Sequence, residues 1–385
     1  MAERQAAITD LLEKRGRAVL DRNRAAFLAL IDPAAGRFRD RQATVFDRLT
    51  KVPFATWEYD YSGEASPLTG YAASGLPKGS VVARVILRYT FDGSDSPVES
   101  QQFLTVVPRD DTWFLAGDRH NLPGVPSGAL GQDIWEVGPV TVVRGRFSLV
   151  LGASQPSVLR AYARHADLAV RDVDAVWTSD WSRRPVIIVP RTQADMAAIV
   201  GTSEAIAEQL TAVATGYYEP DVSHGDRVVV NPAAWEELDR VDRRLVMTHE
   251  VTHLVTQPGD DGSVPVWMGE GFADYVAYRA AGYPAAAVAE DFLEEVLDKD
   301  APRELPRDRD FDPAYGAVET AYEEALLAVD LIVDRYGERK LIELYQAMGD
   351  DEEPVEQDVR TVLGIPMVEF VQDWRTHLRT VARDG

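Results

Sequence analysis

The sequence HEVTH at residues 249–253, followed by WMGEGFADY at residues 267–275, decides how this chain is interpreted. Residues four apart on a helix share one face, so His249 and His253 can direct their imidazoles to one point. Glu250 lies beside them, where its carboxylate can act on a water molecule held by a metal ion. This spacing is typical of zinc-dependent hydrolases and predicts a Zn²⁺ site on a helix over residues 240–256.

Composition limits the possible partners. The chain has 385 residues, enough for two domains, and its apolar content of 45% is normal for a globular protein. The formal net charge of -23 argues against nucleic acid and anionic membrane surfaces as partners. The chain contains no cysteine, so a metal ion would have to be held by histidine and carboxylate groups. We also find no apolar run long enough to span a membrane and no signal peptide in this sequence.

The first part of the chain predicts an α+β domain. Helical spacing over residues 3–31, as one helix or a pair, and over residues 38–49 gives way to alternating apolar and polar residues. The alternating segments are 54–61, 81–91, 101–107 and 112–116. Helices followed by an antiparallel meander are typical of α+β domains. Residues 121–128 are rich in Pro, Gly and Ser, so we expect one domain over 1–128 and a second over 129–385.

The second part predicts a small sheet and many helices. We expect a hairpin of strands 135–143 and 146–151 and further strands over 185–190 and 227–232. Strand 227–232 precedes the metal helix and could pair with an extended peptide at an open edge, or be an ordinary sheet strand. The expected helices are 156–177, 194–200, 204–210, 240–256, one from 266, then 319–336, 341–348, 355–363 and 367–382.

The third metal ligand can be sought by elimination. A catalytic zinc site has three protein ligands and one open position. The metzincin pattern would require Gly at position 256 and His at 259, but the chain has Thr256 and Gly259. An inverted H-x-x-E-H stretch is also absent. The third class of ligand is a glutamate on a following helix. Glu270 fits this class, with sixteen residues between it and His253.

These stretches resemble the gluzincin metallopeptidases, most closely the peptidase MA-like branch related to the aminopeptidase N family. The resemblance covers about residues 130–385. It implies a mostly helical zincin domain with a small mixed sheet and Glu270 as the third zinc ligand. It also implies that Asp274 accepts the free N–H of a ligand histidine, although a plain surface aspartate is equally compatible with the sequence.

In the same family, a tyrosine in a Y-x-x-[GA] setting stabilises the oxyanion. Tyr322, followed by Ala325, fits this setting, although a core tyrosine would show the same helical spacing. Tyr315, followed by Gly316, is the second candidate. The remaining histidines, at positions 120, 165, 224 and 377, lack partner spacing, and we expect them to be surface or packed residues.

The order of elements in residues 1–128 resembles the nuclear-transport-factor-like cone, in which a curved sheet wraps a long helix. This resemblance rests on element order alone. The acidic and aromatic residues at 58–61 are the visible candidates for an activity of this domain, and an alternating strand explains them equally well.

Together the motifs predict a zinc metallopeptidase that acts on peptides or proteins, with Glu250 as general base. The family resemblance favours an exported or cell-envelope location. The aminopeptidases of the family carry a G-x-M-E-N stretch that binds the substrate amine, and this chain has none. We therefore expect endopeptidase action. The alternative is a catalytically silent zincin that binds a ligand, or assists envelope assembly, through its N-terminal domain.

Overall fold

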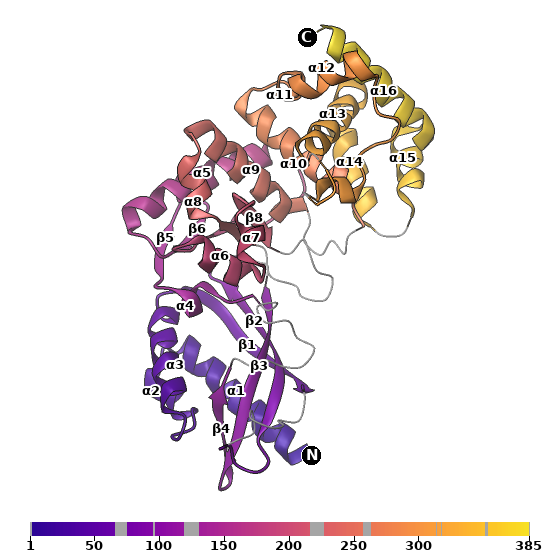
Figure 1. The fold of residues 1–385 in the computed structure, drawn as a ribbon. Coiled ribbons are helices and arrows are strands. Elements are labelled where there is room, and N and C mark those ends of the chain that lie inside the picture. Colours follow the sequence, from indigo (N-terminus) through magenta and orange to yellow (C-terminus); the bar gives the residue numbers. More distant parts are fainter. Residues whose placement is uncertain are drawn as a thin grey trace. The chain divides into compact units, whose positions relative to one another are not determined.

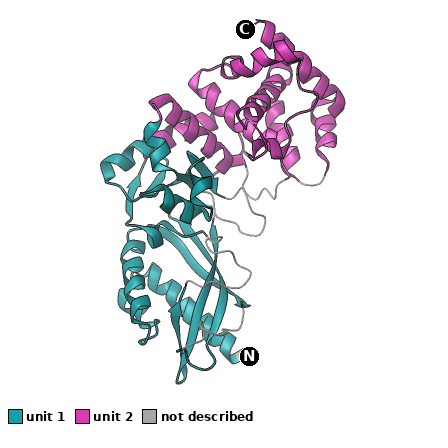
Figure 2. Ribbon diagram, viewed as in Figure 1, with its two compact units in different colours: residues 1–164, 182–237 teal, residues 165–181, 238–385 magenta. Residues whose placement is uncertain are grey.

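The computed structural model describes residues 2–65, 75–94, 97–118, 131–215, 227–256, 263–312, 314–316, 318–350 and 353–384. The chain divides into two compact units (Figure 2). Unit 1 comprises residues 1–164 and 182–237, and unit 2 comprises residues 165–181 and 238–385.

Unit 1 begins with three helices, α1 (Ala2–Leu20), α2 (Arg24–Ala29) and α3 (Gly36–Leu49). The predicted helix over residues 3–31 is therefore a pair. The chain turns between α1 and α2, where Arg22 has a φ of 52°. Asn23 caps α2 by accepting a hydrogen bond from the Ala26 backbone at 3.0 Å.

The helices pack on a four-stranded antiparallel meander with the order β1-β2-β3-β4 (Figure 1). The strands are β1 (Phe54–Glu64), β2 (Val81–Phe91), β3 (Val98–Arg109) and β4 (Thr112–Gly117). Helix α1 contacts β1 and β4. Trp57 pairs with Tyr89 in register, and both side chains are buried in the core. The predicted α+β architecture of this part is confirmed, whereas its likeness to the nuclear-transport-factor-like cone remains a prediction.

A second, five-stranded sheet follows with the order β5-β6-β7-β9-β8. Its strands are β5 (Thr141–Arg144), β6 (Leu149–Gly152), β7 (Val186–Val189), β8 (Ala212–Thr215) and β9 (Arg227–Val230). The pairs β6–β7 and β7–β9 are parallel, and the two outer strands are antiparallel to their neighbours. The expected small mixed sheet is thus present.

One sequence prediction about this sheet was wrong. The segment from Trp135, predicted to open a hairpin strand, begins instead with the short helix α4 (Ile134–Val137), since Asp133 and Glu136 form a capping box at its start. Of the two alternatives for strand β9, the structure shows the ordinary sheet strand, because β9 is hydrogen-bonded to β7 on one side and β8 on the other.

A buried polar network joins the two sheets of unit 1. Arg227 Nη1 lies 3.0 Å from Asp133 Oδ1 and donates to the Tyr89 hydroxyl at 2.8 Å, while that hydroxyl donates to Asp133 at 2.6 Å. All three residues are buried. The predicted domain boundary at 128/129 lies outside the described residues, so the division into domains 1–128 and 129–385 stays a prediction.

The boundary between the two units falls within helix α5 (Pro156–Asp174), after residue 164. Three further helices belong to unit 1: α6 (Gln193–Val200), α7 (Glu204–Ala207) and α8 (Pro232–Glu237).

Unit 2 is mostly helical, as predicted. Its helices are α9 (Arg240–Thr256), α10 (Val266–Ala281), α11 (Ala285–Val288), α12 (Glu290–Lys299), α13 (Val318–Tyr336), α14 (Glu338–Gly349), α15 (Val355–Leu363) and α16 (Met367–Asp384), with a 3-10 turn over Asp308–Phe311. Among the described helices, none is both long and apolar enough to cross a membrane.

Candidate metal centre

Helix α9 presents the two histidines, and an ion pair fixes its orientation within unit 2. Arg244 donates two hydrogen bonds to Asp172, at 2.8 and 2.7 Å. The Thr248 hydroxyl, one turn further along α9, donates to the same carboxylate at 3.3 Å. The turn that precedes His249 is therefore tied to the segment that carries Asp172. No spacing pattern predicts this pair, because the two residues lie far apart along the chain.

Helix α10 supplies the carboxylates. It begins after Pro265 and ends at Gly282, whose φ of 81° closes the helix. Trp267 is buried and packs on Phe370 of α16, with ring centroids 6.2 Å apart. Glu270 follows one turn later and is only 4% exposed. A carboxylate buried to this degree needs a positively charged or hydrogen-bonding partner.

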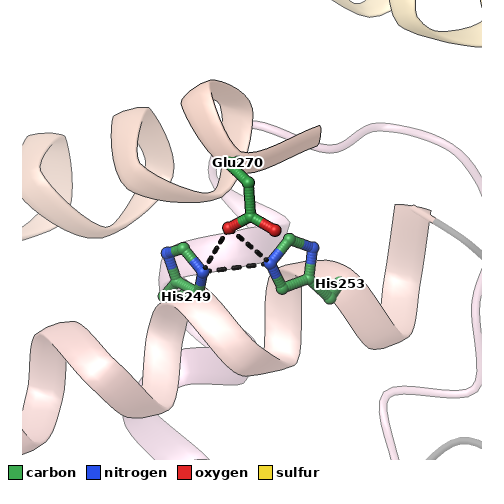
Figure 3. A group of neighbouring side chains, drawn as sticks. All are labelled: His249, His253 and Glu270. Carbon is green, nitrogen blue, oxygen red and sulfur yellow. Dashed lines mark hydrogen bonds and ion pairs between the residues drawn. The ribbon is translucent and has the colours of Figure 1, made fainter. Parts of the chain in front are cut away.

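The three predicted ligands converge on one point (Figure 3). The Nε2 atoms of His249 and His253 lie 3.0 Å apart. Glu270 Oε2 lies 3.2 Å from the first of these nitrogens and 3.4 Å from the second. The structure thus brings together two residues from one helix and a third from the next, as the sequence predicted.

The spacing fits a tetrahedral zinc ion. Zinc binds imidazole nitrogen and carboxylate oxygen at about 2.0–2.2 Å, and the corners of a tetrahedron of that size are about 3.3–3.6 Å apart. The three observed separations, 3.0, 3.2 and 3.4 Å, are close to this range. Glu270 Oε2 also accepts no hydrogen bond from the described residues. Two imidazoles and one carboxylate are a donor set that suits Zn²⁺.

Asp274, one turn after Glu270, contacts the first histidine. Its Oδ1 lies 2.8 Å from His249 Nδ1. When Nδ1–H donates to this carboxylate, the lone pair of Nε2 is directed at the point where the ligands converge. The contact favours the supporting role of Asp274 over that of a plain surface aspartate.

The electrostatics of the cluster favour a positive charge at its centre. Burial opposes protonation of His249, but the neighbouring carboxylates of Asp274 and Glu270 outweigh burial and raise its pKa well above the usual value. Burial alone would raise the pKa of Glu270, but the neighbouring imidazoles of His253 and His249 lower it below its usual range. In the metal-free chain a proton would take the place of the cation.

Glu250, the predicted general base, is half-buried on α9. It directly follows His249 and lies three residues before His253, so it shares a helix face with the second ligand. This position differs from that of the fully buried Glu270 and leaves the Glu250 carboxylate partly accessible.

Tyr322 lies beside the ligands, on α13. Its ring centroid is 6.3 Å from that of His249, and Phe311 packs edge-on against it at 5.3 Å. Tyr315 is 69% exposed and lies before α13 begins. The geometry therefore favours Tyr322 over Tyr315 as the residue that reaches the site.

The other histidines differ in their setting. His377 Nε2 lies 3.3 Å from Asp330 Oδ2, which makes it a packed residue between α16 and α13. His165 is half-buried on α5. His120 and His224 lie outside the described residues.

Residues 228–380 match the model of the Peptidase MA superfamily. This segment contains α9, α10 and α13, and therefore all three candidate ligands. The match confirms the resemblance seen in the sequence motifs. No curated protein matches the chain.

Among solved structures, the M1 zinc metallopeptidase from Deinococcus radiodurans is similar at 14% identity and a TM-score of 0.40, covering 86% of this chain and 72% of that one. A mutant of the same enzyme gives 14% identity, 85% and 71% coverage and a TM-score of 0.40. A two-domain M1 zinc metallopeptidase mutant bound to L-tryptophan gives 14% identity, the same coverage and a TM-score of 0.37.

Proposed function

We propose that this chain, whose residues 228–380 match the Peptidase MA superfamily, is a zinc-dependent peptidase with its active site on α9, α10 and α13. The observation that carries the proposal is the convergence of His249, His253 and Glu270 within bonding reach of a single ion. In this proposal these three residues hold Zn²⁺. When bound, zinc supplies Lewis acidity, which polarises a substrate carbonyl and lowers the pKa of water.

The chain's own groups perform the proton transfers. Glu250 accepts a proton from the water that attacks the peptide carbonyl and then delivers it to the departing amine. The Tyr322 hydroxyl donates a hydrogen bond to the oxygen that gains negative charge during the attack. Asp274 keeps His249 in one tautomer through the 2.8 Å contact at Nδ1.

The test compares the parent chain with Glu250→Gln. The variant keeps the shape of the side chain but cannot accept a proton, so we expect it to retain one zinc per chain and to lose about 10²–10⁴-fold in peptide hydrolysis. Glu343→Gln is the matched control, because Glu343 lies on α14 of the same unit and pairs with Arg339 and Lys340. A Glu250→Gln variant that cleaves peptides as fast as the parent would overturn the assignment.

We further propose that the enzyme is an endopeptidase. The support is the absence of any G-x-M-E-N stretch, which binds the substrate amine in aminopeptidases of the family that the sequence resembles. Peptides with acetylated N-termini should then be cleaved as fast as the same peptides with free N-termini. Cleavage restricted to free N-termini would show that the chain is an aminopeptidase instead.

Unit 1 supports a second candidate function, the binding of a small carboxylate. Arg15 on α1 is only 7% exposed. It donates to Gln42 Oε1 and to the Tyr59 hydroxyl and stacks over the Phe27 ring. Within the described part of the chain it has no carboxylate partner, and its Nη1 atom, which is buried, has no hydrogen bond. An unpaired buried cation is costly, so an anionic ligand at this point would stabilise the unit.

Thermal unfolding distinguishes this rival. Acetate, benzoate and citrate serve as probes against the parent and Arg15→Met, which keeps the length of the side chain without its charge. If unit 1 binds a small carboxylate and the chain is not a peptidase, one probe should raise the Tm of the parent but not that of Arg15→Met. The zinc-loaded chain should then cleave no member of a broad peptide library. Peptide cleavage, with no probe raising the Tm, would leave only the peptidase.

A further inference from the structure

Gly271 lies at a close backbone contact between α10 and α13. Helices α10 and α13 contact one another within unit 2 (Figure 1). A Cβ atom placed on Gly271 would lie 2.6 Å from the Ala325 carbonyl oxygen and 2.8 Å from its carbonyl carbon. It would also lie 3.0 Å from Val329 Cγ2. Backbone atoms cannot rotate away as side chains do, so only glycine fits here.

This contact lies within one turn of two residues of the proposed active site. Gly271 directly follows Glu270, which the proposed function makes a zinc ligand. Ala325 lies three residues after Tyr322, a rise of about 4.5 Å along the helix. The backbone contact at Gly271 therefore determines how closely the start of α13, with its tyrosine, approaches the helix that carries the metal ligand.

Tyr322 is also constrained from other directions. Its ring lies 6.3 Å from that of His249 and 5.3 Å from that of Phe311. Contacts with these two rings restrict the rotamers open to Tyr322, so a shift of α13 would carry the phenol with it. A change in the distance between α10 and α13 would therefore move the Tyr322 phenol.

We infer that Gly271 is a positioning residue that sets the reach of the Tyr322 hydroxyl to the reacting carbonyl. The inference rests on the proposed peptidase function. An alanine at this position would need about 0.8 Å more room to turn the 2.6 Å approach into an ordinary contact of about 3.4 Å. A misplacement of about 1 Å in a reacting constellation can cost about 10²-fold in rate.

A double-mutant cycle tests the inference, using Gly271→Ala, Tyr322→Phe and the double variant. We expect Gly271→Ala to retain one zinc per chain, to lower kcat by about 10- to 100-fold and to change KM by less than about threefold. In the Tyr322→Phe background the same change should cost less than about twofold, because the group that it displaces is already gone. Equal losses in both backgrounds would overturn the inference.

A stability control separates positioning from general loosening. Ile332 is fully buried on α13, ten residues beyond Tyr322, and Ile332→Val removes one methylene group there. Each variant is assayed at the same number of degrees below its own Tm. If Ile332→Val then lost as much kcat as Gly271→Ala, the loss of kcat in Gly271→Ala would reflect lower stability, and the inference would be wrong.

A structural readout keeps the inference testable should the parent prove to have no peptidase activity. Crystal structures of the parent and of Gly271→Ala should show the Tyr322 ring displaced from His249 by about 0.5–0.8 Å, because the added Cβ needs about 0.8 Å more room against Ala325. A Tyr322 ring that stays in place, with an intact variant fold, would refute the positioning role irrespective of catalysis.

Discussion

Replacing Asp274 should weaken zinc binding without removing a metal ligand. Asp274 Oδ1 lies 2.8 Å from His249 Nδ1, whereas the proposed ligand atom of His249 is Nε2 on the opposite side of the ring. Residues that orient metal-bound histidines typically contribute 10–100-fold to affinity, which corresponds to about 1.4–2.7 kcal/mol. Asp274→Ala should reach the upper part of this range, because it leaves Nδ1–H without its acceptor. Asp274→Asn should lie near the lower end, because its amide oxygen can still accept.

The assay is competition for zinc between each variant and a chromophoric chelator of known affinity. Asp330→Asn is the matched control, because Asp330 also pairs with a histidine, His377, at 3.3 Å but belongs to no metal cluster among the described residues. We expect its zinc affinity to equal that of the parent. An Asp274→Ala variant that binds zinc as tightly as the parent would refute the idea that this carboxylate orients His249.

Three further predictions concern stability. Removing zinc with a chelator should lower the Tm, because metal binding stabilises only the folded chain. Zinc but not magnesium should restore the Tm, because the imidazole and carboxylate donors suit zinc. A Tm that does not respond to either treatment would contradict the zinc site. Asp133→Ala should cost about 3–5 kcal/mol in denaturant unfolding, because it leaves the buried Arg227 guanidinium without its carboxylate; a loss below about 1 kcal/mol would show that the network is not a stabilising pair. Burial, together with the charges of Asp310 and Glu323, raises the pKa of Glu324 from its usual value of 4.5 to about 7. The folded chain therefore binds this proton more tightly, and its stability falls as pH rises from about 4.5 to 7. Glu324→Gln should accordingly reduce the loss of stability between pH 5 and pH 8 by on the order of 1–2 kcal/mol after solvent screening, and an unchanged loss in urea unfolding would contradict the shift.

The metal site could be predicted because its main constraint is local. Helical spacing alone places His249 and His253 on one face, and a glutamate on the following helix is the simplest source of a third ligand. The distances of 3.0–3.4 Å between ligand atoms agree with that expectation. The roles of Glu250 and Tyr322 are not fixed by spacing alone and remain proposals.

Other features depend on contacts between distant segments and were missed or wrong. Strand β8 (Ala212–Thr215) has only four residues and no alternation strong enough to identify it, because its pairing with β9 determines its structure. That pairing also closes the edge that the sequence left open at β9. The Arg244–Asp172 pair joins residues far apart along the chain, so no spacing pattern could have indicated it.

Two helices did carry local signals. Asp133 and Glu136 have the capping-box spacing that starts α4, but the apolar Ile134 and Trp135 favoured a strand. Helix α12 (Glu290–Lys299) begins with two acidic residues, ends with a lysine and has buried apolar positions at helical spacing. The residues at the helix ends therefore predict both helices.

Anomalous diffraction at the zinc absorption edge, from crystals grown with Zn²⁺, is the sharpest test of the zinc site. We expect one strong peak in unit 2, about 2.0–2.2 Å from His249 Nε2, His253 Nε2 and a carboxylate oxygen of Glu270. We also expect the peak to persist in Glu250→Gln, since that residue is not a proposed ligand. A peak elsewhere, or none at these three residues, would contradict the zinc site and with it the proposed peptidase.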